Sequence, residues 1–587
     1  MAYHRRNLTH MLNRLLAQYR RYLTNYESTL AYALLGLIGG IASGLIVLAF
    51  EVSIQEIALL WGVDGSGEGF ESLPRWALFA LPVAGAVVLG VVFSFLRPED
   101  RETGIVHVLS RMHSHYGVLP VRNAIVQFIA GAFALATGQS GGREGPGVHL
   151  GGAINSQLGQ RLGLPNNSLR VLIACGTAGG IAAAFNTPLA GVIFAMEVIV
   201  AEYTVAGFLP VILAAVSAAA ISRQFGGGAA EFSMPPVTLN SLWEIPYVVL
   251  LGACCGAAIA LFIRISRLSA GFSHWPVLLR FTLAGLLTGS LAIMVPQILG
   301  IGYDTLGLVL AGRLSLALLL AIAASKLIAT AFSAGMGMPI GLIGPSLLIG
   351  ACMGGALGTV GQELFPQLAS QPALYIMLGM GAAMGAVLSA PLAAILAIIE
   401  LTQTISIAMP AMLAIVTANL TNTGIFRQRS AHQTVLRHLK RQVPDDPLNQ
   451  LLHRTNVTSS MEISVTRMDS TLAHTALDTF LNATPGWCLL TRDGEDLYLV
   501  NGNALADWLH SQGEPDSEQP IDLTHADIRR WSVVSVPEQA TLRQTMDALK
   551  RETAEAALVY SRGTGGQRVL QGIVTRESIE RFSLARL

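Results

Sequence analysis

Charged residues are scarce in this sequence, since Asp, Glu, Lys and Arg make up only 13% of its 587 residues. A soluble protein is about one-quarter charged. About half of the 37 basic and 37 acidic residues lie from Arg427 onwards, and long apolar segments fill the rest. Ala31–Phe50 alone has no charge and is long enough to cross a bilayer as a helix. This balance excludes a soluble globular enzyme, a disordered chain and a nucleic-acid binder driven by basic charge.

Cysteine is also rare. The 5 cysteines are odd in number and widely scattered, and most of them lie in apolar segments. This pattern predicts neither a disulfide framework nor a zinc site, and no other metal site is expected. Glycine is abundant by contrast, with 60 residues, which is typical of close helix packing and irregular backbone inside a membrane bundle.

We predict four parts along the chain. Residues 1–29 form a cytoplasmic amphipathic helix, 30–440 a transmembrane domain, 441–455 a linker, and 456–587 a small α/β domain of two similar segments. Arginines cluster before the first apolar segment and after the last one. We therefore expect a multi-pass protein of the cell membrane with both termini in the cytoplasm.

An internal repeat is the most informative feature of the transmembrane domain. Gly142-Arg-Glu-Gly-Pro146 returns 199 residues later as Gly341-Leu-Ile-Gly-Pro345, and Pro188-Leu-Ala returns 203 residues later as Pro391-Leu-Ala. Two motifs in the same order at nearly one separation indicate two homologous halves, at about residues 30–222 and 245–424. Halves with helices broken by Gly and Pro are typical of transporters that bind substrate near the bilayer midplane.

Each Gly-Pro motif suits the N-terminus of a helix, because proline is favoured in the first turn. A helix N-terminus presents free N–H groups and the positive end of the helix dipole, so it attracts anions. Two repeat-related N-termini aimed at one point would make an anion site without a buried lysine. Backbone amides would also avoid holding the anion too tightly for transport.

Glu144 is unusual in this setting, because an acid in an anion site is itself a tethered anion. Ionised, it can occupy the site, and protonated, it can leave, which predicts a gate that also accepts protons. The alternative is a first-turn acid that only satisfies local N–H groups. The counterpart of Glu144 in the second half is Ile343, which favours the gate.

These motifs resemble the CLC family of chloride channels and anion/proton antiporters. The resemblance rests on residues 142–146, 183–191, 300–303 and 341–345, and extends over roughly residues 30–440. It implies an all-α polytopic membrane fold of two inverted repeats of broken, tilted helices, in a homodimer with one pore per subunit. The C-terminal segments resemble a pair of CBS domains.

The resemblance places the family's external gating glutamate at Glu144, and the backbone groups that hold the central anion at Leu342 and Ile343. We expect neighbouring motif residues to contribute to the same anion site, namely Gly142, Arg143 and Gly145.

Three positions depart from the family pattern. Thr103 stands in Glu102-Thr-Gly-Ile-Val106, where the family has Gly-Ser-Gly-Ile-Pro, and still offers a hydroxyl to an anion. His432 aligns with the pore tyrosine, and either lines the inner pore or faces water at the membrane boundary. Val198 aligns with the internal proton-relay glutamate of the antiporters, and an apolar side chain cannot relay a proton.

Several other polar residues in apolar segments receive structural interpretations. Glu197 and its repeat counterpart Glu400 are predicted to serve helix packing, and His149 to satisfy packing or local polar groups. Lys326 is expected to snorkel or to pair. In the CBS-like part, Thr575 and Glu577 match the nucleotide signature only partly, so an adenine nucleotide there is a secondary hypothesis beside dimer stabilisation or coupling to the gate.

We therefore expect a dimeric CLC-type transporter of chloride or a similar small anion in the lipid bilayer. Proton exchange is favoured by Glu144, whereas passive conduction is favoured by the substitutions at Val198 and His432. Bicarbonate, nitrate and fluoride are alternative anions. No nucleic-acid partner is expected, and no cofactor apart from that nucleotide. The sequence lacks His-Glu-x-x-His and Gly-x-Ser-x-Gly motifs, which argues against an enzyme.

Overall fold

The computed structural model describes residues 29–63, 69–201, 205–226, 237–438, 451–452, 455–472, 485–492, 495–511, 521–562 and 568–584. Nearly all of the residues predicted as the N-terminal helix, 1–29, and as the linker, 441–455, lie outside these ranges. The chain divides into two compact units. The first is Met1–Gly163 with Leu169–Val443, and the second is Leu164–Ser168 with Pro444–Leu587.

The first unit is helical, as predicted. Its first half contains α2 (Thr29–Leu59), α3 (Arg75–Phe95), α4 (Gly104–Ser114), α5 (Val121–Ala136), α6 (Glu144–Leu162), α7 (Asn166–Phe185), α8 (Pro188–Phe194) with the π-helix η3 (Ala195–Val200), and α9 (Val205–Phe225). Its second half contains α10 (Ile245–Ala270), α11 (Val277–Met294), α12 (Tyr303–Leu310), α13 (Leu316–Gly335), α14 (Ile343–Leu364), α15 (Pro372–Leu388), α16 (Pro391–Thr402), α17 (Ala408–Leu420) with the π-helix η8 (Thr421–Ile425), and α18 (Ala431–His438). Nine helices in the described part of the chain are long and apolar enough to cross a membrane.

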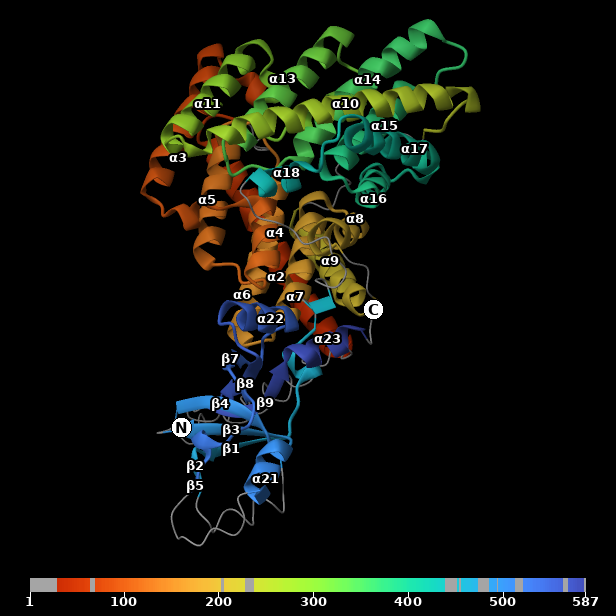
Figure 1. Ribbon diagram of the computed structural model, residues 1–587. Helices are drawn as coiled ribbons and strands as arrows, with labels where there is room; N and C mark the ends of the chain where they lie inside the picture. The colour runs from red at the N-terminus through yellow and green to blue at the C-terminus, as the bar shows by residue number, and fades with distance from the viewer. Residues whose placement is uncertain are drawn as a thin grey trace, which may run out of the picture. The chain divides into compact units, whose positions relative to one another are not determined.

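The sequence repeat is also a repeat in packing. Helices α6 and α7 approach so closely that a Cβ atom on Gly151 or Gly176 would collide with the backbone of the other helix. The same relation holds in the second half between Gly350 of α14 and Gly379 of α15, two helices that run side by side (Figure 1). Glycine at these crossings allows the backbones to touch, which side chains of ordinary size would prevent.

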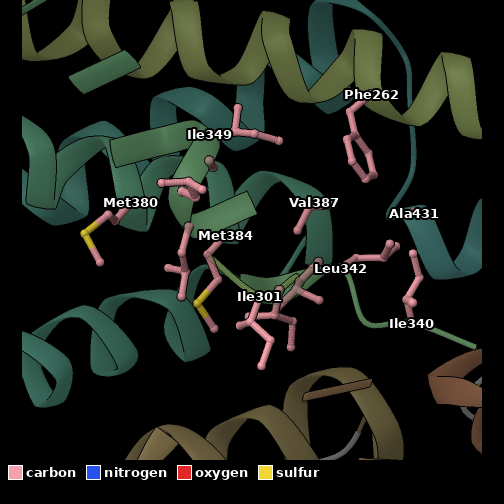
Figure 2. Close-up of a cluster of buried hydrophobic side chains, with 14 of the residues drawn as sticks. Phe262, Ile301, Ile340, Leu342, Ile349, Met380, Met384, Val387 and Ala431 are labelled. Atoms are coloured by element: carbon pink, nitrogen blue, oxygen red, sulfur yellow. The ribbon is translucent and has the colours of Figure 1, made fainter. Parts of the chain in front are cut away.

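The core of the first unit is formed by apolar side chains, both aliphatic and aromatic. Figure 2 shows part of it, in which Phe262 of α10 and Ile349 of α14 lie in one cluster with Met380, Met384 and Val387 of α15. Many side chains on the outer faces of the long helices are large, apolar and exposed. Such faces suit lipid rather than water, so the unit is built as a multi-pass membrane domain.

The second unit is a small α/β domain, as predicted. It contains β1 (Val465–Asp469), β2 (Thr471–Leu472), β3 (Trp487–Arg492), β4 (Glu495–Asn501), α21 (Gly502–Ser511), β5 (Ile521–Asp522), β6 (Arg530–Trp531), β7 (Val533–Pro537), α22 (Leu542–Arg551), β8 (Ala556–Arg562), β9 (Arg568–Thr575) and α23 (Arg576–Leu584). Its sheets have the strand orders β1-β3-β4-β6, β7-β8-β9 and β2-β5.

The two larger sheets share one topology. In each, a strand pairs in parallel with the next strand of that sheet, which then pairs antiparallel with its successor, and a helix follows: β1, β3, β4 and α21 in one, β7, β8, β9 and α23 in the other. Apolar side chains from both sheets form a common cluster that includes Leu489 and Leu558. Tyr560 of β8 also donates a hydrogen bond to Asp496 of β4, over 2.6 Å. The two similar segments therefore pack into one body.

Candidate anion site

The two Gly-Pro motifs meet directly. The Gly142 N–H donates to the Gly341 carbonyl over 2.9 Å, and the Gly341 N–H donates to the Gly142 carbonyl over 2.8 Å. This antiparallel bridge joins segments that immediately precede α6 and α14. The predicted convergence of two helix N-termini from opposite halves is therefore confirmed.

Glu144 lies at the centre of this junction and is fully buried. Its Oε2 accepts a hydrogen bond from the Gly344 N–H over 3.2 Å, and its Oε1 accepts one from the Tyr303 hydroxyl over 2.5 Å. Glu144 belongs to the first turn of α6, yet it is bound by the first turn of α14. The carboxylate thus accepts a hydrogen bond from the N-terminus of the helix in the other half, and is not bound only by N–H groups of its own first turn.

Tyr303 was not singled out as a site residue from the sequence. It begins α12, directly after a turn in which Gly300 and Gly302 have positive φ angles of 57° and 87°. That conformation favours glycine, so the Gly-Ile-Gly-Tyr segment was a usable signal. The hydroxyl contact with Glu144 spans 159 residues and has no local sequence pattern.

Lys326 holds the same turn in place. It is completely buried in α13, and its Nζ donates to the carbonyl oxygens of Ile298 (3.0 Å), Gly300 (2.9 Å) and Ile301 (3.3 Å). The expectation that Lys326 snorkels towards the membrane surface is therefore wrong, because its ammonium group is satisfied by buried backbone. The turn that it binds leads directly into Tyr303.

The side chain of Arg143 is committed to protein partners. Its Nη2 donates to the Ala184 carbonyl over 2.7 Å, its Nε lies 3.3 Å from the Glu51 carboxylate, and its guanidinium stands over the Tyr303 ring at 5.2 Å. Arg143 itself is the N-cap residue of α6, and Leu342 has the same position in α14. Its contribution to an anion site would therefore come from the backbone.

Thr103 stands at a third helix N-terminus, as the N-cap residue of α4. The Gly104 N–H donates to Gln127 Oε1 over 2.7 Å, and Gln127 Nε2 donates to the Pro339 carbonyl over 3.2 Å. Because Pro339 is two residues before Gly341, this glutamine ties the start of α4 to the segment that carries the second Gly-Pro motif. The structure places the half-buried Thr103 beside that link.

His432 lies in the first turn of α18 and is only 5% exposed. The interpretation that it faces water is therefore wrong. Its Nε2 has no hydrogen-bond partner in the part of the chain that the structure describes. Figure 2 shows the adjacent Ala431 in the same apolar cluster as Ile340 and Leu342. The start of α18 thus packs into the cluster that contains the N-cap residue of α14.

The remaining predicted positions are placed as follows. Val198 is half-buried in η3 and packs against the apolar core. In the second unit, Thr575 is buried and its hydroxyl accepts the Ser578 N–H over 3.1 Å, while the exposed Glu577 forms an ion pair with Arg581 at 2.9 Å. Within the described ranges, no group of three or more His, Cys, Asp or Glu residues could hold a metal ion.

Comparisons with known proteins agree with this architecture. The family model for the voltage gated chloride channel matches residues 84–423. A putative chloride channel protein ClcB-like from Ralstonia nicotianae is 34% identical over 400 residues, which cover 66% of this chain and 92% of that protein. The H(+)/Cl(-) exchange transporter ClcA of Vibrio cholerae serotype O1 is 29% identical over 448 residues, covering 74% of this chain and 92% of that protein.

A solved structure shows the same fold. The crystal structure of a slow cyanobacterial Cl-/H+ antiporter superimposes with a TM-score of 0.63 at 23% identity, covering 70% of this chain and 98% of that one. The fold and the paired helix tips define a polytopic membrane protein of the transporter class. The chain belongs to the voltage gated chloride channel family, the CLC family.

Proposed function

We propose that this protein carries chloride, or a similar small anion, across a lipid bilayer, and that Glu144 gates the anion site at the N-termini of α6 and α14. One observation carries the proposal: the buried Glu144 carboxylate is bound by the Gly344 N–H and by Tyr303 at the junction of the two halves. A carboxylate held there stands in for a permeant anion. The site is therefore suited to negative charge without a dedicated cationic ligand.

The physical basis is competition for the same N–H groups. An ionised Glu144 competes with an external anion for the tip of α14, whereas a protonated Glu144 has lost its charge and competes poorly. Anion entry would therefore be linked to protonation of one side chain. This linkage supports exchange of anions against protons, in keeping with the H(+)/Cl(-) exchange named for the Vibrio relative.

Passive conduction is the second candidate. It is favoured by Val198, which offers no group that could take up a proton at the position where the antiporters of the family have an acid. In that case Glu144 would open and close the pore without moving protons stoichiometrically.

Flux measurements on purified protein in liposomes separate the two candidates. For exchange, the reversal potential shifts when a pH gradient is imposed at a fixed chloride gradient, and chloride influx drives proton movement. For a channel, the reversal potential follows chloride alone. E144Q removes the titratable group and keeps the shape, so we expect it to abolish proton movement while chloride flux continues. Liposomes that pass no halide at all would overturn the transport proposal itself.

Other features of the proposal rest on the family resemblance. We propose a homodimer with one pore per subunit, cytoplasmic termini, and a CBS-like regulatory role for the second unit. Selectivity among chloride, nitrate, bicarbonate and fluoride is tested by the same assay with each anion in turn. An adenine nucleotide at Thr575 and Glu577 is tested by a thermal shift with ATP, and the matched variant E577A should remove any shift.

A further inference from the structure

Two buried histidines form a direct contact between α4 and α6. His107 Nδ1 and His149 Nε2 are 2.7 Å apart, and both side chains are almost completely buried. The other nitrogen of His107, Nε2, lies 3.8 Å from the Glu102 carboxylate and accepts a hydrogen bond from Arg111 Nε over 3.1 Å. The Glu102 side chain is 27% exposed, so it links the buried pair to the edge of the domain.

The hydrogen-bond partners fix the direction of proton donation between the two histidines. Because Arg111 donates to Nε2 of His107, the ring proton of neutral His107 is on Nδ1. That proton is donated to Nε2 of His149, and the ring proton of His149 is therefore on Nδ1. This last N–H is buried and has no acceptor among the residues that the structure describes. A buried donor of this kind is satisfied in proteins by water or by a ligand.

The His149 Nδ1–H group, which ends this series of hydrogen bonds, lies on α6, the helix that also carries Glu144. His149 follows Glu144 by five residues on α6, which is a rise of about 7.5 Å along the helix axis. The exposed end, Glu102, directly precedes Thr103 at the start of α4. The three side chains thus run from the partly exposed Glu102 carboxylate, through the two imidazoles in contact, to α6, the helix that carries the buried Glu144.

We propose that Glu102, His107 and His149 form a proton relay that serves Glu144 and takes the role that Val198 cannot fill. The inference rests on the proposed exchange of anions against protons. In the forward step, Glu102 passes a proton to His107 Nε2, His107 releases its Nδ1 proton to His149 Nε2, and His149 releases its Nδ1 proton to water leading to Glu144. One proton enters and one leaves. Each ring then turns so that its new Nε2–H group faces the exit side and its bare Nδ1 faces the incoming proton, which makes the relay ready for the next transfer.

The charged neighbours suit transfer rather than storage of a proton. The positive charge of the Arg111 guanidinium disfavours protonation of His107, whereas the negative charge of the Glu102 carboxylate favours it. An incoming proton also needs the lone pair that Arg111 occupies, so this hydrogen bond must open for each transfer. The hydrogen bond from Arg111 therefore keeps His107 and His149 neutral between transfers.

The test compares proton flux and chloride flux in the same liposomes. H149Q keeps a polar partner for His107 but cannot pass a proton from one ring nitrogen to another. We expect it to lower chloride-driven proton flux by about tenfold or more, with chloride flux changed less than about twofold. E102Q removes the acid at the partly exposed end of the relay, where no fold defect is expected. It should slow proton entry and so lower proton flux, as H149Q does. H113Q is the matched control, because His113 is on the same helix as His107 and its Nδ1 hydrogen-bonds to the Leu109 carbonyl of that helix.

The outcomes distinguish this inference from the function on which it rests. A wild-type protein that moves chloride without protons would remove the proposed exchange and the relay with it. A wild-type protein that exchanges, with H149Q and E102Q keeping the same proton-to-chloride ratio, would overturn the relay alone. Loss of proton flux in both variants but not in H113Q supports it, and retained chloride flux shows that the fold is intact.

Discussion

Glu197 and Glu400 each cap a helix that belongs to the other half of the protein. The Glu197 carboxylate accepts the N–H groups of Leu392 (3.3 Å) and Ala393 (2.8 Å) at the start of α16. The Glu400 carboxylate accepts those of Leu189 (3.0 Å) and Ala190 (2.8 Å) at the start of α8. Helices α8 and α16 lie side by side (Figure 1). Such reciprocity is what an approximate two-fold relation between the halves produces, and it confirms the structural role predicted for both acids.

The reciprocal caps predict equal losses of stability. E197A and E400A each leave two N–H groups at a helix N-terminus without an acceptor, so each should lower the free energy of unfolding by about 1–3 kcal/mol. The measurement is thermal unfolding of purified protein in detergent. E197Q and E400Q retain an acceptor oxygen and should lose less. A large loss for one alanine variant with none for the other would contradict the reciprocal arrangement.

The sequence predicts the parts of the site that local rules determine. Gly and Pro fix where α6 and α14 begin, and the repeat relates the two starts to each other, so Gly142–Pro146 and Gly341–Pro345 could be assigned before the structure was known. The contacts made by Tyr303 and Lys326 could not, because they join segments that share no motif. The pairing of His107 with His149 depends in the same way on how α4 packs against α6.

Tyr303 should restrain the gate. Y303F removes the hydroxyl that donates to Glu144, and a hydrogen bond to a charged group contributes about 1.5–3 kcal/mol. The carboxylate would then leave the Gly344 N–H more readily, so chloride flux should rise several-fold or more. Y375F is the control, because the Tyr375 hydroxyl donates to Glu244, away from the anion site. Unchanged or slower chloride flux in Y303F would show that the hydroxyl does not hold the gate.

Lys326 should act through the turn that precedes Tyr303. K326M leaves three buried carbonyl oxygens without their common donor, which should lower the free energy of unfolding by about 2 kcal/mol. Because the same turn positions Tyr303, chloride flux should shift in the direction of Y303F. K326Q keeps N–H donors but removes the charge. If K326Q behaves like wild type, the role is hydrogen bonding; if it behaves like K326M, the positive charge itself is required.

Cys488 offers a probe of the second unit. The residue lies in β3 and is completely buried, and burial raises the pKa of its thiol to about 12. Only the thiolate reacts with maleimides, and at pH 8 it makes up about one part in ten thousand of such a thiol, against about a quarter at the ordinary pKa near 8.5. The peptide that contains Cys488 should therefore stay unlabelled in the native full-length protein at pH 8, as followed by mass spectrometry. Labelling should accelerate as pH rises towards 12, or when denaturant unfolds the sheet. Rapid labelling at pH 8 without denaturant would show that β3 opens readily in the native protein.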